Sequence, residues 1–308
     1  MYIPKVSIII PVYNGSNYLS EAIDSALAQS YKNIEILVVN DGSDDDGATE
    51  KVALSYGDKI RYLKKDNGGS SSALNYGIKK MNGDFFSWLS HDDLYAENKI
   101  KRQIELIGSN KNTISICGAG LIDGDGKAIP YPKKMLDGEF SSAQMMQWLC
   151  SGHNINGCGV LIPKSIIDNA GFFNEKFVYV NDLDYWFRLM MYGVDCICTQ
   201  EKLVLTRIHP NQVTVKKSNL FLMEHKAMSE QIINRLLTGC RKDDTRKILQ
   251  EYLRLSARLG EMDVVTNTIF ELKSKGYNTK IVSYWIIFAY GKCINVGKKI
   301  YKKIFFKR

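Results

Sequence analysis

The stretches VSIIIPVYN (6–14), IEILVVNDGS (34–43) and DFFSWLSHDD (84–93) each join a hydrophobic run to a polar or acidic end. Runs this apolar, separated by stretches with helical spacing, are typical of central parallel strands covered by helices on both faces. In open sheets of this kind the ligand binds at the carboxyl ends of the strands. We therefore expect Asp41 and the pair Asp92–Asp93 to line one crevice, where clustered carboxylates suit a divalent cation and a phosphorylated ligand.

The order of the predicted elements indicates an α/β fold. Strands alternate with helices up to about residue 110, which is the signature of βαβ units and of a mostly parallel sheet. GDGK (124–127) is a turn that opens a hairpin, and residues 218–274 have helical spacing. The predicted strands are residues 6–12, 34–40, 60–64, 84–89, 113–122 and 157–163. The predicted helices are residues 17–30, 46–56, 70–81, 96–109, 141–149, 164–171 and 182–192.

Composition indicates a globular protein with reduced thiols. The 308 residues are 45% hydrophobic, which is enough for one large α/β domain and a smaller addition. The seven cysteines are odd in number and form no CxxC pair, and MYIPKVSIII enters a strand without the layout of a signal peptide. Cys196 and Cys198 alternate on a predicted strand, where packing is a better interpretation than metal binding. We therefore expect a cytoplasmic protein.

The net positive charge lies at the carboxyl-terminal end. The chain holds 41 Lys and Arg against 33 Asp and Glu, a formal net charge of +8. Residues 276–308 carry eight basic residues and no acidic one, so residues 1–275 hold 33 charges of each sign. A formally neutral body argues against a broad nucleic-acid-binding surface.

The tail has the pattern of a membrane-binding helix. IVSYWIIFAY (281–290) is apolar but too short to span a bilayer, which takes about 20 residues. At 100° per residue, Lys298, Lys299, Lys302 and Lys303 share one side, and the isoleucines and aromatic residues share the other. This pattern predicts peripheral binding to an anionic membrane surface, on its cytoplasmic face. A packing helix with a solvated lysine face is the alternative.

Seven segments resemble, in order, the motifs of the inverting family 2 glycosyltransferases, which have a GT-A fold. They run from residue 4 to about residue 214 and are PKVSIIIPVYN, VVNDGS, DNGGSSSALNYG, HDD, GFFNEKF, NDLDYWFRL and RIHPNQVT. Each motif alone is weakly specific, whereas the full set in family order is strongly so. The resemblance implies a Rossmann-like, mostly parallel central sheet with helices on both faces, followed by a C-terminal helical extension.

The resemblance also implies how the chain is organised and what it does. We expect a GT-A glycosyltransferase domain over residues 1–215, a helical extension over 216–275 and the membrane-associating tail over 276–308. The implied reaction is metal-dependent, inverting transfer of a sugar from a nucleotide diphosphate, in particular a UDP-sugar, to a glycan acceptor. The tail favours a lipid-linked acceptor, as in the synthesis of bacterial surface polysaccharide or O-antigen.

The family pattern implies a set of residues that bind the donor. Tyr13 would stack on the nucleotide base, because an aromatic face suits a flat ring. Asp41 would accept a hydrogen bond from the imide of uracil or thymine, although an isolated NDG is also typical of an Asx turn or a helix cap. The implied nucleotide-sugar-binding residues are Pro11, Tyr13, Asp41, Asn67, Asn75, Asp92 and Arg207.

The doublet of Asp92 and Asp93 corresponds to the family's DxD-type motif. A sugar diphosphate leaving group is negatively charged, and oxygen ligands favour Mn²⁺ or Mg²⁺. The resemblance implies that Asp93 binds the metal directly, that Asp92 contacts the ribose or the metal's water shell, and that His209 approaches the metal or the diphosphate. Ser90 and Leu74 depart from the family, which often has Asp and Arg at these positions, so the nucleotide contacts differ in detail.

Inversion also needs a general base. One carboxylate must deprotonate the acceptor hydroxyl as it attacks the anomeric carbon from the face opposite the diphosphate. The resemblance assigns this role to Asp182, which follows Asn181 where the family usually has an acidic residue. Asp184 is the alternative, and Asp182 is equally suited to cap the following helix, a role compatible with that of a base. SGHNINGCG (151–159) is expected to form a loop facing the acceptor.

Two other functions stay open. A nucleotidyltransferase would carry a Gly-rich loop with an activating Arg or Lys directly after the first strand, which VYNGSNYLSEA (12–22) lacks. A non-catalytic binding subunit would have lost the base or the metal-binding carboxylates, and this chain keeps both.

Overall fold

The computed structural model describes residues 3–110, 112–131, 136–210, 218–239 and 242–274. The chain divides into two compact units. Unit 1 comprises residues 1–145 and 154–217, and unit 2 comprises residues 146–153 and 218–308. Unit 1 holds the ten-stranded sheet and every residue of the predicted site. The predicted tail, residues 276–308, lies outside the described residues.

The strands are β1 (Val6–Val12), β2 (Ile34–Asp41), β3 (Arg61–Lys65), β4 (Phe85–Trp88), β5 (Leu94–Tyr95), β6 (Thr113–Ile122), β7 (Ala128–Ile129), β8 (Gly138–Phe140), β9 (Val160–Pro163) and β10 (Asp195–Arg207). The helices up to residue 207 are α1 (Leu19–Leu27), α2 (Ala48–Leu54), α3 (Ser70–Lys80), α4 (Lys99–Ile107), α5 (Ser142–Cys150), α6 (Lys164–Ala170), α7 (Asn181–Met191) and two 3₁₀ turns, η1 (Gly57–Lys59) and η2 (Gly157–Gly159). The later helices are α9 (Ser218–Gly239), α10 (Lys242–Leu259) and α11 (Met262–Ser274).

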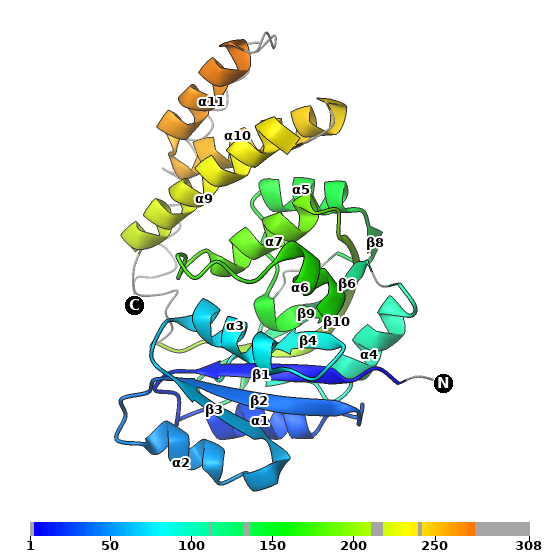
Figure 1. Cartoon of the computed structure of the whole chain (residues 1–308), viewed down its shortest axis with the longest axis vertical. Coiled ribbons are helices and arrows are strands. Elements are labelled where there is room, and N and C mark those ends of the chain that lie inside the picture. The colour runs from blue at the N-terminus through cyan, green and yellow to red at the C-terminus, as the bar shows by residue number, and fades with distance from the viewer. Residues whose placement is uncertain (1–2, 111, 132–135, 211–217, 240–241, 275–308) are drawn as a thin grey trace. The chain divides into compact units, whose positions relative to one another are not determined.

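Strand β1 is buried along its whole length because helices cover both faces of the sheet. In Figure 1, α1 and α2 lie on one side of β1 to β3, and α3 lies on the other. Ile8 and Ile10 belong to one apolar cluster with Leu19 of α1. On the other face α3 approaches so closely that a Cβ on Gly77 would lie 2.6 Å from the side chain of Ile9. Alternate residues of β1 therefore contact different helices, which explains why the strand shows no polar alternation.

The sheet is ordered β3-β2-β1-β4-β9-β6-β10-β5, with β7 paired to β6 and β8 to β10. Strands β3, β2, β1 and β4 pair in parallel, and so do β6 and β10. Strand β9 lies between these groups and is antiparallel to both β4 and β6. The predicted α/β fold is confirmed, and β9 makes the sheet mixed. Strands β1, β2, β4, β6 and β10 all run in one direction, so their carboxyl ends meet at one edge.

Most predicted elements are confirmed, and GDGK does open the antiparallel hairpin of β6 and β7. Several boundaries differ from expectation, and the helix expected over 17–30, for example, is α1 over Leu19–Leu27. The strand expected over 157–163 begins only at Val160, because the side chain of Asn156 accepts the N–H of Cys158 at 2.9 Å and closes η2 instead. The helix expected over 96–109 begins at Lys99, because β5 pairs with β10 just before it.

The cysteines that the structure describes are free, buried thiols, namely Cys117, Cys150, Cys158, Cys196 and Cys198. Cys196 and Cys198 are 1% and 2% exposed, so the packing interpretation is confirmed. Burial also raises the pKa of the Cys117 thiol to about 11, which keeps it protonated.

Unit 2 contains α9, α10 and α11, which include a buried polar cluster. His225 Nδ1 lies 2.7 Å from Glu261 Oε1, and Ser229 Oγ donates to Glu261 Oε2 at 3.0 Å. Tyr252 Oη donates to Ser229 Oγ at 3.0 Å, so these buried groups satisfy one another. Among the helices that the structure describes, none combines the length and the apolar character needed to cross a membrane.

Candidate active site

Asp92 and Asp93 follow β4 in a tight turn, in which the N–H of Asp93 donates to the carbonyl of Ser90 at 3.2 Å. Asp93 is 5% exposed, and the side chain of Asp92 is 15% exposed. Burial, together with the neighbouring charge of Asp92, raises the pKa of Asp93 to about 7. A cation at this turn would stabilise the charged forms of both carboxylates.

The end of β10 brings two further residues to this turn. Arg207 donates its backbone N–H to Asp93 Oδ1 at 3.0 Å, and His209 Nε2 lies 3.0 Å from Asp92 Oδ2. The ring of Tyr18 lies 5.2 Å from the ring of His209. The structure therefore brings together the residues that the sequence relates to a metal, although more than 100 positions separate them.

Arg207 has a different environment from the one expected. Its side chain is 1% exposed. Nε donates to the carbonyl of Asp92 at 3.0 Å, Nη1 to the carbonyl of Gly124 at 2.9 Å, and Nη2 to Glu21 Oε2 at 2.6 Å. Because the guanidinium binds protein groups within a buried setting, its position does not support the expected contact with the donor diphosphate.

Residues 154–158 connect the separate parts of the site. Asn154 Nδ2 donates to Asp182 Oδ2 at 3.3 Å, at the start of α7. Asn156 Nδ2 donates to Thr206 Oγ1 at 2.9 Å, at the end of β10. The segment therefore joins the predicted base to the strand end that contacts the carboxylate pair.

Cys158, the last residue of that segment, contacts the turn itself. The backbone N–H of Ser90 donates to Cys158 Sγ at 3.2 Å, and the S–H of Cys158 donates to Ser90 Oγ at 3.3 Å. Burial raises the pKa of Cys158 well above its usual range, so the sulfur stays protonated and can donate. Ser90, one of the positions at which the chain departs from the family, is thus hydrogen-bonded to a thiol.

Asp182 lies in the first turn of α7 and is partly buried. Its Oδ1 accepts the N–H of Leu183 at 2.7 Å, and its Oδ2 accepts the amide of Asn154. Burial raises the pKa of Asp182, whereas both hydrogen bonds lower it. A carboxylate that is desolvated and oriented in this way has the character of a general base.

The alternative base, Asp184, is already paired. It is 3% exposed, and its Oδ2 lies 2.8 Å from Arg188 Nε. Asn181, which replaces the acidic residue of the family, donates to Ser71 Oγ at 3.0 Å and so ties the start of α7 to α3. These contacts favour Asp182 over Asp184 as the group that takes the acceptor proton.

Asp41 ends β2 and is 3% exposed. Its Oδ2 accepts the N–H of Gly69 at 2.7 Å, and its Oδ1 lies 2.7 Å from Lys65 Nζ and 3.1 Å from the N–H of Gly68. Asp41 therefore anchors the loop between β3 and α3, while Asn67 in that loop is exposed. The contact with a nucleotide base stays a prediction for both residues.

Pro11 and Tyr13 lie at the end of β1. Pro11 is buried and lies opposite Val39 in the parallel register of β1 and β2. Tyr13 is 44% exposed, and its Oη donates to Asp44 Oδ1 at 3.1 Å. Asn14 Nδ2 donates to the same oxygen at 2.5 Å, which joins the loops after β1 and β2. The exposed ring of Tyr13 is compatible with the predicted stacking on a base.

Asn75 has its amide engaged inside the protein. It is 3% exposed, and its Nδ2 donates to the carbonyl of Phe173 at 3.0 Å and to Glu175 Oε1 at 2.8 Å. Its Oδ1 accepts the N–H of Phe173 at 2.9 Å. These bonds give Asn75 the role of holding the loop before α7, and they do not support the expected contact with the donor.

The chemistry of the carboxylate turn fits a hard divalent cation. Within the described ranges, no three His, Cys, Asp or Glu side chains are already grouped as a metal site. Mg²⁺ commonly takes only one or two carboxylates from the protein and completes its shell with substrate phosphates and water. Asp92, Asp93 and His209 match such a partial set, and burial and the charge of Asp92 raise the pKa of Asp93 to about 7, an effect that a bound cation would oppose.

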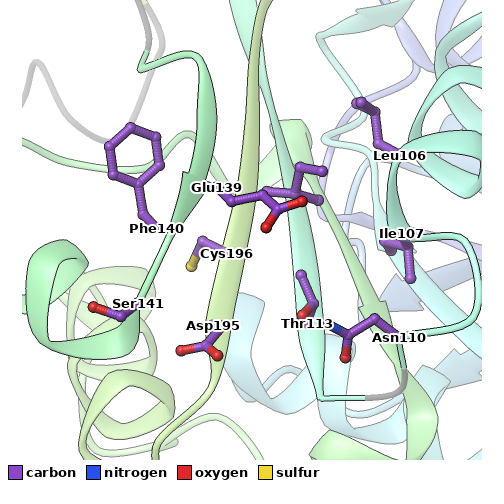
Figure 2. A pocket seen from close by; sticks show the side chains of 10 residues that line it. Leu106, Ile107, Asn110, Thr113, Glu139, Phe140, Ser141, Asp195 and Cys196 are labelled. Atoms are coloured by element: carbon purple, nitrogen blue, oxygen red, sulfur yellow. The ribbon is translucent and has the colours of Figure 1, made fainter.

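A small cavity of about 210 Å³ lies elsewhere in unit 1 (Figure 2). Ile107 and Phe140 give it an apolar wall, and Glu139 and Asp195 add two acidic groups. Its lining includes Thr113 and Asp195, the first residues of β6 and β10. The cavity is therefore at the edge of the sheet opposite the carboxylate turn, and none of the predicted site residues lines it.

Sequence reasoning missed several residues that support the site. Tyr18 and Glu21 are three positions apart at the start of α1. This spacing indicates that they share one helix face, but it does not identify Arg207 as the residue that both contact. Asn154 and Cys158 lie in the expected acceptor-facing loop, where no pattern predicts their contacts.

Comparison with known proteins agrees with this fold. The sequence profile described as Glycosyl transferase family 2 matches residues 7–171, more than half of the chain. The chain belongs to glycosyltransferase family 2.

Three relatives show how widely the similarity extends. A Rickettsia felis protein named uncharacterized glycosyltransferase is 50% identical over 224 residues, which are 71% of this chain and 36% of that protein. A Rickettsia prowazekii protein with the same kind of name is 39% identical over 318 residues, covering 92% of this chain and 96% of that protein. The minor teichoic acid biosynthesis protein GgaB of Bacillus subtilis is 33% identical over 172 residues, 54% of this chain and 19% of GgaB. The chain thus spans about a third of the R. felis relative.

Among solved structures, S. aureus TarS 1–349 in complex with UDP-GlcNAc has a TM-score of 0.69 to this chain. The two are 17% identical, and the match covers 86% of this chain and 79% of TarS 1–349. This likeness confirms the expected GT-A fold.

Proposed function

We propose that this protein is a metal-dependent, inverting glycosyltransferase that transfers a sugar from a UDP-sugar to a glycan acceptor. The observation that carries the proposal is the meeting of Asp92, Asp93 and His209 at one edge of the sheet, joined through residues 154–158 to Asp182. A cation-binding group and a separate base are the two parts that a metal-dependent inverting transfer requires.

Two observations support a uridine nucleotide as the donor. Tyr13 and Asp41 end the neighbouring strands β1 and β2, so a base stacked on Tyr13 would lie near Asp41. The structurally similar TarS was solved with UDP-GlcNAc. In our proposal the exposed ring of Tyr13 stacks on uracil, Asn67 lies in the loop beside it, and Asp41 accepts the imide N–H.

Asp93 and His209 would hold Mn²⁺ or Mg²⁺, and Asp92 would contact the ribose or the metal's water shell. When bound, the cation supplies positive charge to the diphosphate as it leaves. The chain's own contribution is to fix the directions of the two carboxylates, through the bond from the N–H of Arg207 to Asp93 and the pairing of His209 with Asp92.

Asp182 takes the proton of the acceptor hydroxyl. The hydroxyl oxygen attacks the anomeric carbon on the face opposite the diphosphate, the bond to the diphosphate oxygen breaks, and the configuration inverts. Asn154 and the N–H of Leu183 hold the carboxylate of Asp182 in place during this transfer.

For the acceptor we propose a lipid-linked glycan used in surface polysaccharide synthesis. The relative GgaB, named for teichoic acid biosynthesis, supports an acceptor of this class. The basic amphipathic sequence over 276–308 supports a peripheral location on the cytoplasmic face of the membrane, where a lipid-linked glycan is accessible.

A donor screen tests the proposal. Purified protein is incubated with Mn²⁺, a bacterial glycolipid extract and each of a panel of nucleotide sugars, and nucleoside diphosphate release is followed. We expect release from a UDP-sugar, dependent on the extract and lost in EDTA and in Asp182→Asn. Release from GDP-sugars alone would contradict the uridine assignment, and full activity in EDTA would contradict the metal.

A further inference from the structure

We propose that Arg207 is a positioning residue for the carboxylate pair, and that Tyr18 and Glu21 at the start of α1 hold it in place. Arg207 then acts on the donor only through the turn of Asp92 and Asp93. The inference deepens the proposed function and rests on it wherever bound metal and nucleotide are concerned.

The guanidinium of Arg207 donates to protein groups from each of its three nitrogens. Nη1 donates to the carbonyls of Asp123 and Gly124 at 3.4 and 2.9 Å. Nη2 donates to Glu21 Oε2 at 2.6 Å, and Nε donates to the carbonyl of Asp92 at 3.0 Å. A guanidinium has five N–H donors on three nitrogens, and these four bonds engage all three nitrogens. Because the side chain is also 1% exposed, a diphosphate would have to displace internal bonds to reach it.

Arg207 fixes both halves of the turn. Its Nε holds the main chain at the carbonyl of Asp92, and its backbone N–H holds the side chain of Asp93 through Oδ1. The first bond sets where the turn lies, and the second sets where the carboxylate points. Metal ligands must be held within about 0.5 Å of their productive positions, so the loss of either bond should affect cation binding.

Two residues at the start of α1 also contact the guanidinium. The ring of Tyr18 lies 4.4 Å from its central carbon, in a cation–π contact. Glu21 is in the first turn of α1, and its side chain is 49% exposed. Glu21 therefore supplies the counter-charge for a buried cation while its own carboxylate still reaches water. A buried guanidinium that loses its counter-charge is strongly destabilised, so Glu21 should keep Arg207 in position.

The positioning role and a direct contact predict different binding behaviour. If Arg207 positions the turn, substitutions of Arg207 and of Glu21 both weaken cation binding. Removing a group that orients a metal ligand typically lowers metal affinity about 10–100-fold. If Arg207 instead contacts the diphosphate, its substitution weakens UDP binding even without metal. Substitution of Glu21 then leaves cation affinity unchanged.

The test uses the full-length chain with Glu21→Gln and Arg207→Lys. The Mn²⁺ dissociation constant is measured with saturating UDP from the paramagnetic resonance signal of free Mn²⁺, and UDP binding in EDTA is measured by calorimetry. We expect both variants to bind Mn²⁺ about 10–100-fold more weakly and to resemble each other in UDP affinity in EDTA, since both act through the turn. Glu105→Gln is the matched control, because it removes a carboxylate that is similarly exposed and pairs with Arg102 on α4.

Hydrogen exchange of the Ser90–Asp93 turn gives a readout without metal or nucleotide. We expect faster exchange there in Glu21→Gln and unchanged exchange in β1, which also shows that the variant folds. Unchanged exchange and unchanged Mn²⁺ affinity in Glu21→Gln would overturn the positioning role, as would a loss of UDP affinity in EDTA for Arg207→Lys that Glu21→Gln does not share. If the unsubstituted chain binds neither Mn²⁺ nor UDP, the proposed function fails, and the exchange result alone decides the role of Arg207.

Discussion

Arg188 Nε lies 2.8 Å from Asp184 Oδ2, one helical turn away on α7, and both side chains are largely buried. Asp182, two residues earlier, accepts hydrogen bonds from neutral groups, the N–H of Leu183 and the amide of Asn154. Asp184 is thus engaged in an ion pair, whereas burial raises the pKa of Asp182 and makes it a stronger base. The two carboxylates at the start of α7 should therefore differ in function.

Substitution of each carboxylate should separate catalysis from stability. Asp182→Asn should lower kcat by about 10²–10⁴-fold while UDP binding is retained, because only the proton transfer is lost. Asp184→Asn should keep most of the activity and lower the thermal unfolding temperature, because it leaves Arg188 buried without its counter-charge. Nucleoside diphosphate release and thermal unfolding measure the two effects. An inactive Asp184→Asn beside an active Asp182→Asn would identify Asp184 as the base.

The acid limb of the pH–rate profile should report Asp182. Burial raises the pKa of this carboxyl, and a base acts only when deprotonated, so kcat should fall as the pH drops through a value above the usual range of Asp. The bond from Asn154 lowers the pKa of Asp182. Asn154→Ala should therefore move the acid limb to higher pH. A limb that stays in place in this variant would mean that another group controls it.

Metal removal and Asp93→Asn should have the same effect. The amide keeps an acceptor for the N–H of Arg207 but lacks the charge that attracts a cation, so the fold should persist while Mn²⁺-dependent UDP binding is lost. Calorimetry with and without EDTA measures this. UDP binding that EDTA weakens equally in Asp93→Asn and in the unsubstituted chain would contradict the role of Asp93 as a ligand.

Gly15→Ala should destabilise the protein near the carboxylate turn. A Cβ at Gly15 would lie 2.3 Å from His91 Cδ2 and 2.6 Å from Val12 Cγ2, so the His91 ring must move. Overpacking of this kind typically costs about 1–3 kcal/mol of unfolding free energy. Gly124→Ala is the control, because its Cβ would meet Tyr18 Oη at 3.4 Å, an ordinary contact. Equal urea midpoints for both variants would show that the loop yields without cost.

The tail should bind anionic membranes. Each basic residue near such a surface contributes about 1 kcal/mol, so changing Lys298, Lys299, Lys302 and Lys303 to Glu should lower liposome partitioning by several powers of ten, with strong salt dependence. Deleting residues 276–308 should have the same effect, and soluble-donor binding should be unchanged. Equal co-sedimentation of the full-length and shortened chains would contradict membrane binding.

The central strands could be predicted because continuous apolar runs in the sequence indicate that both faces of each strand are buried. A run such as VSIIIPV, apolar on both alternating sides, has no stable place except between two layers of helices. The register of β9 could not be predicted in the same way. VLIP (160–163) is equally apolar, and its antiparallel place between β4 and β6 depends on pairings with residues 40 to 80 positions away.

The types of residue in the site could be predicted from the sequence, but the groups that each side chain contacts could not. Asn75 and Arg207 have the chemistry of ligand-binding groups, and their partners within the protein lie at Phe173 and Glu21, which no local pattern relates to them. The pair of Asp184 and Arg188 is different, because i, i+4 spacing places opposite charges on one helix face. That spacing by itself favours Asp182 over Asp184 as the base.

Glu21 and Arg207 are 186 positions apart in the sequence, so the carboxylate turn gains its anchor only after β10 has been synthesised. The four parallel strands that precede the turn are complete by residue 88 and pair among themselves. During translation a nascent chain can therefore hold four of the ten strands while Asp92 and Asp93 are still unconstrained, because pairing over long separations comes late in folding. We therefore expect the chain to bind a cation only near the end of synthesis of unit 1. A chain interrupted before residue 207 would keep the first four strands but would not bind the cation.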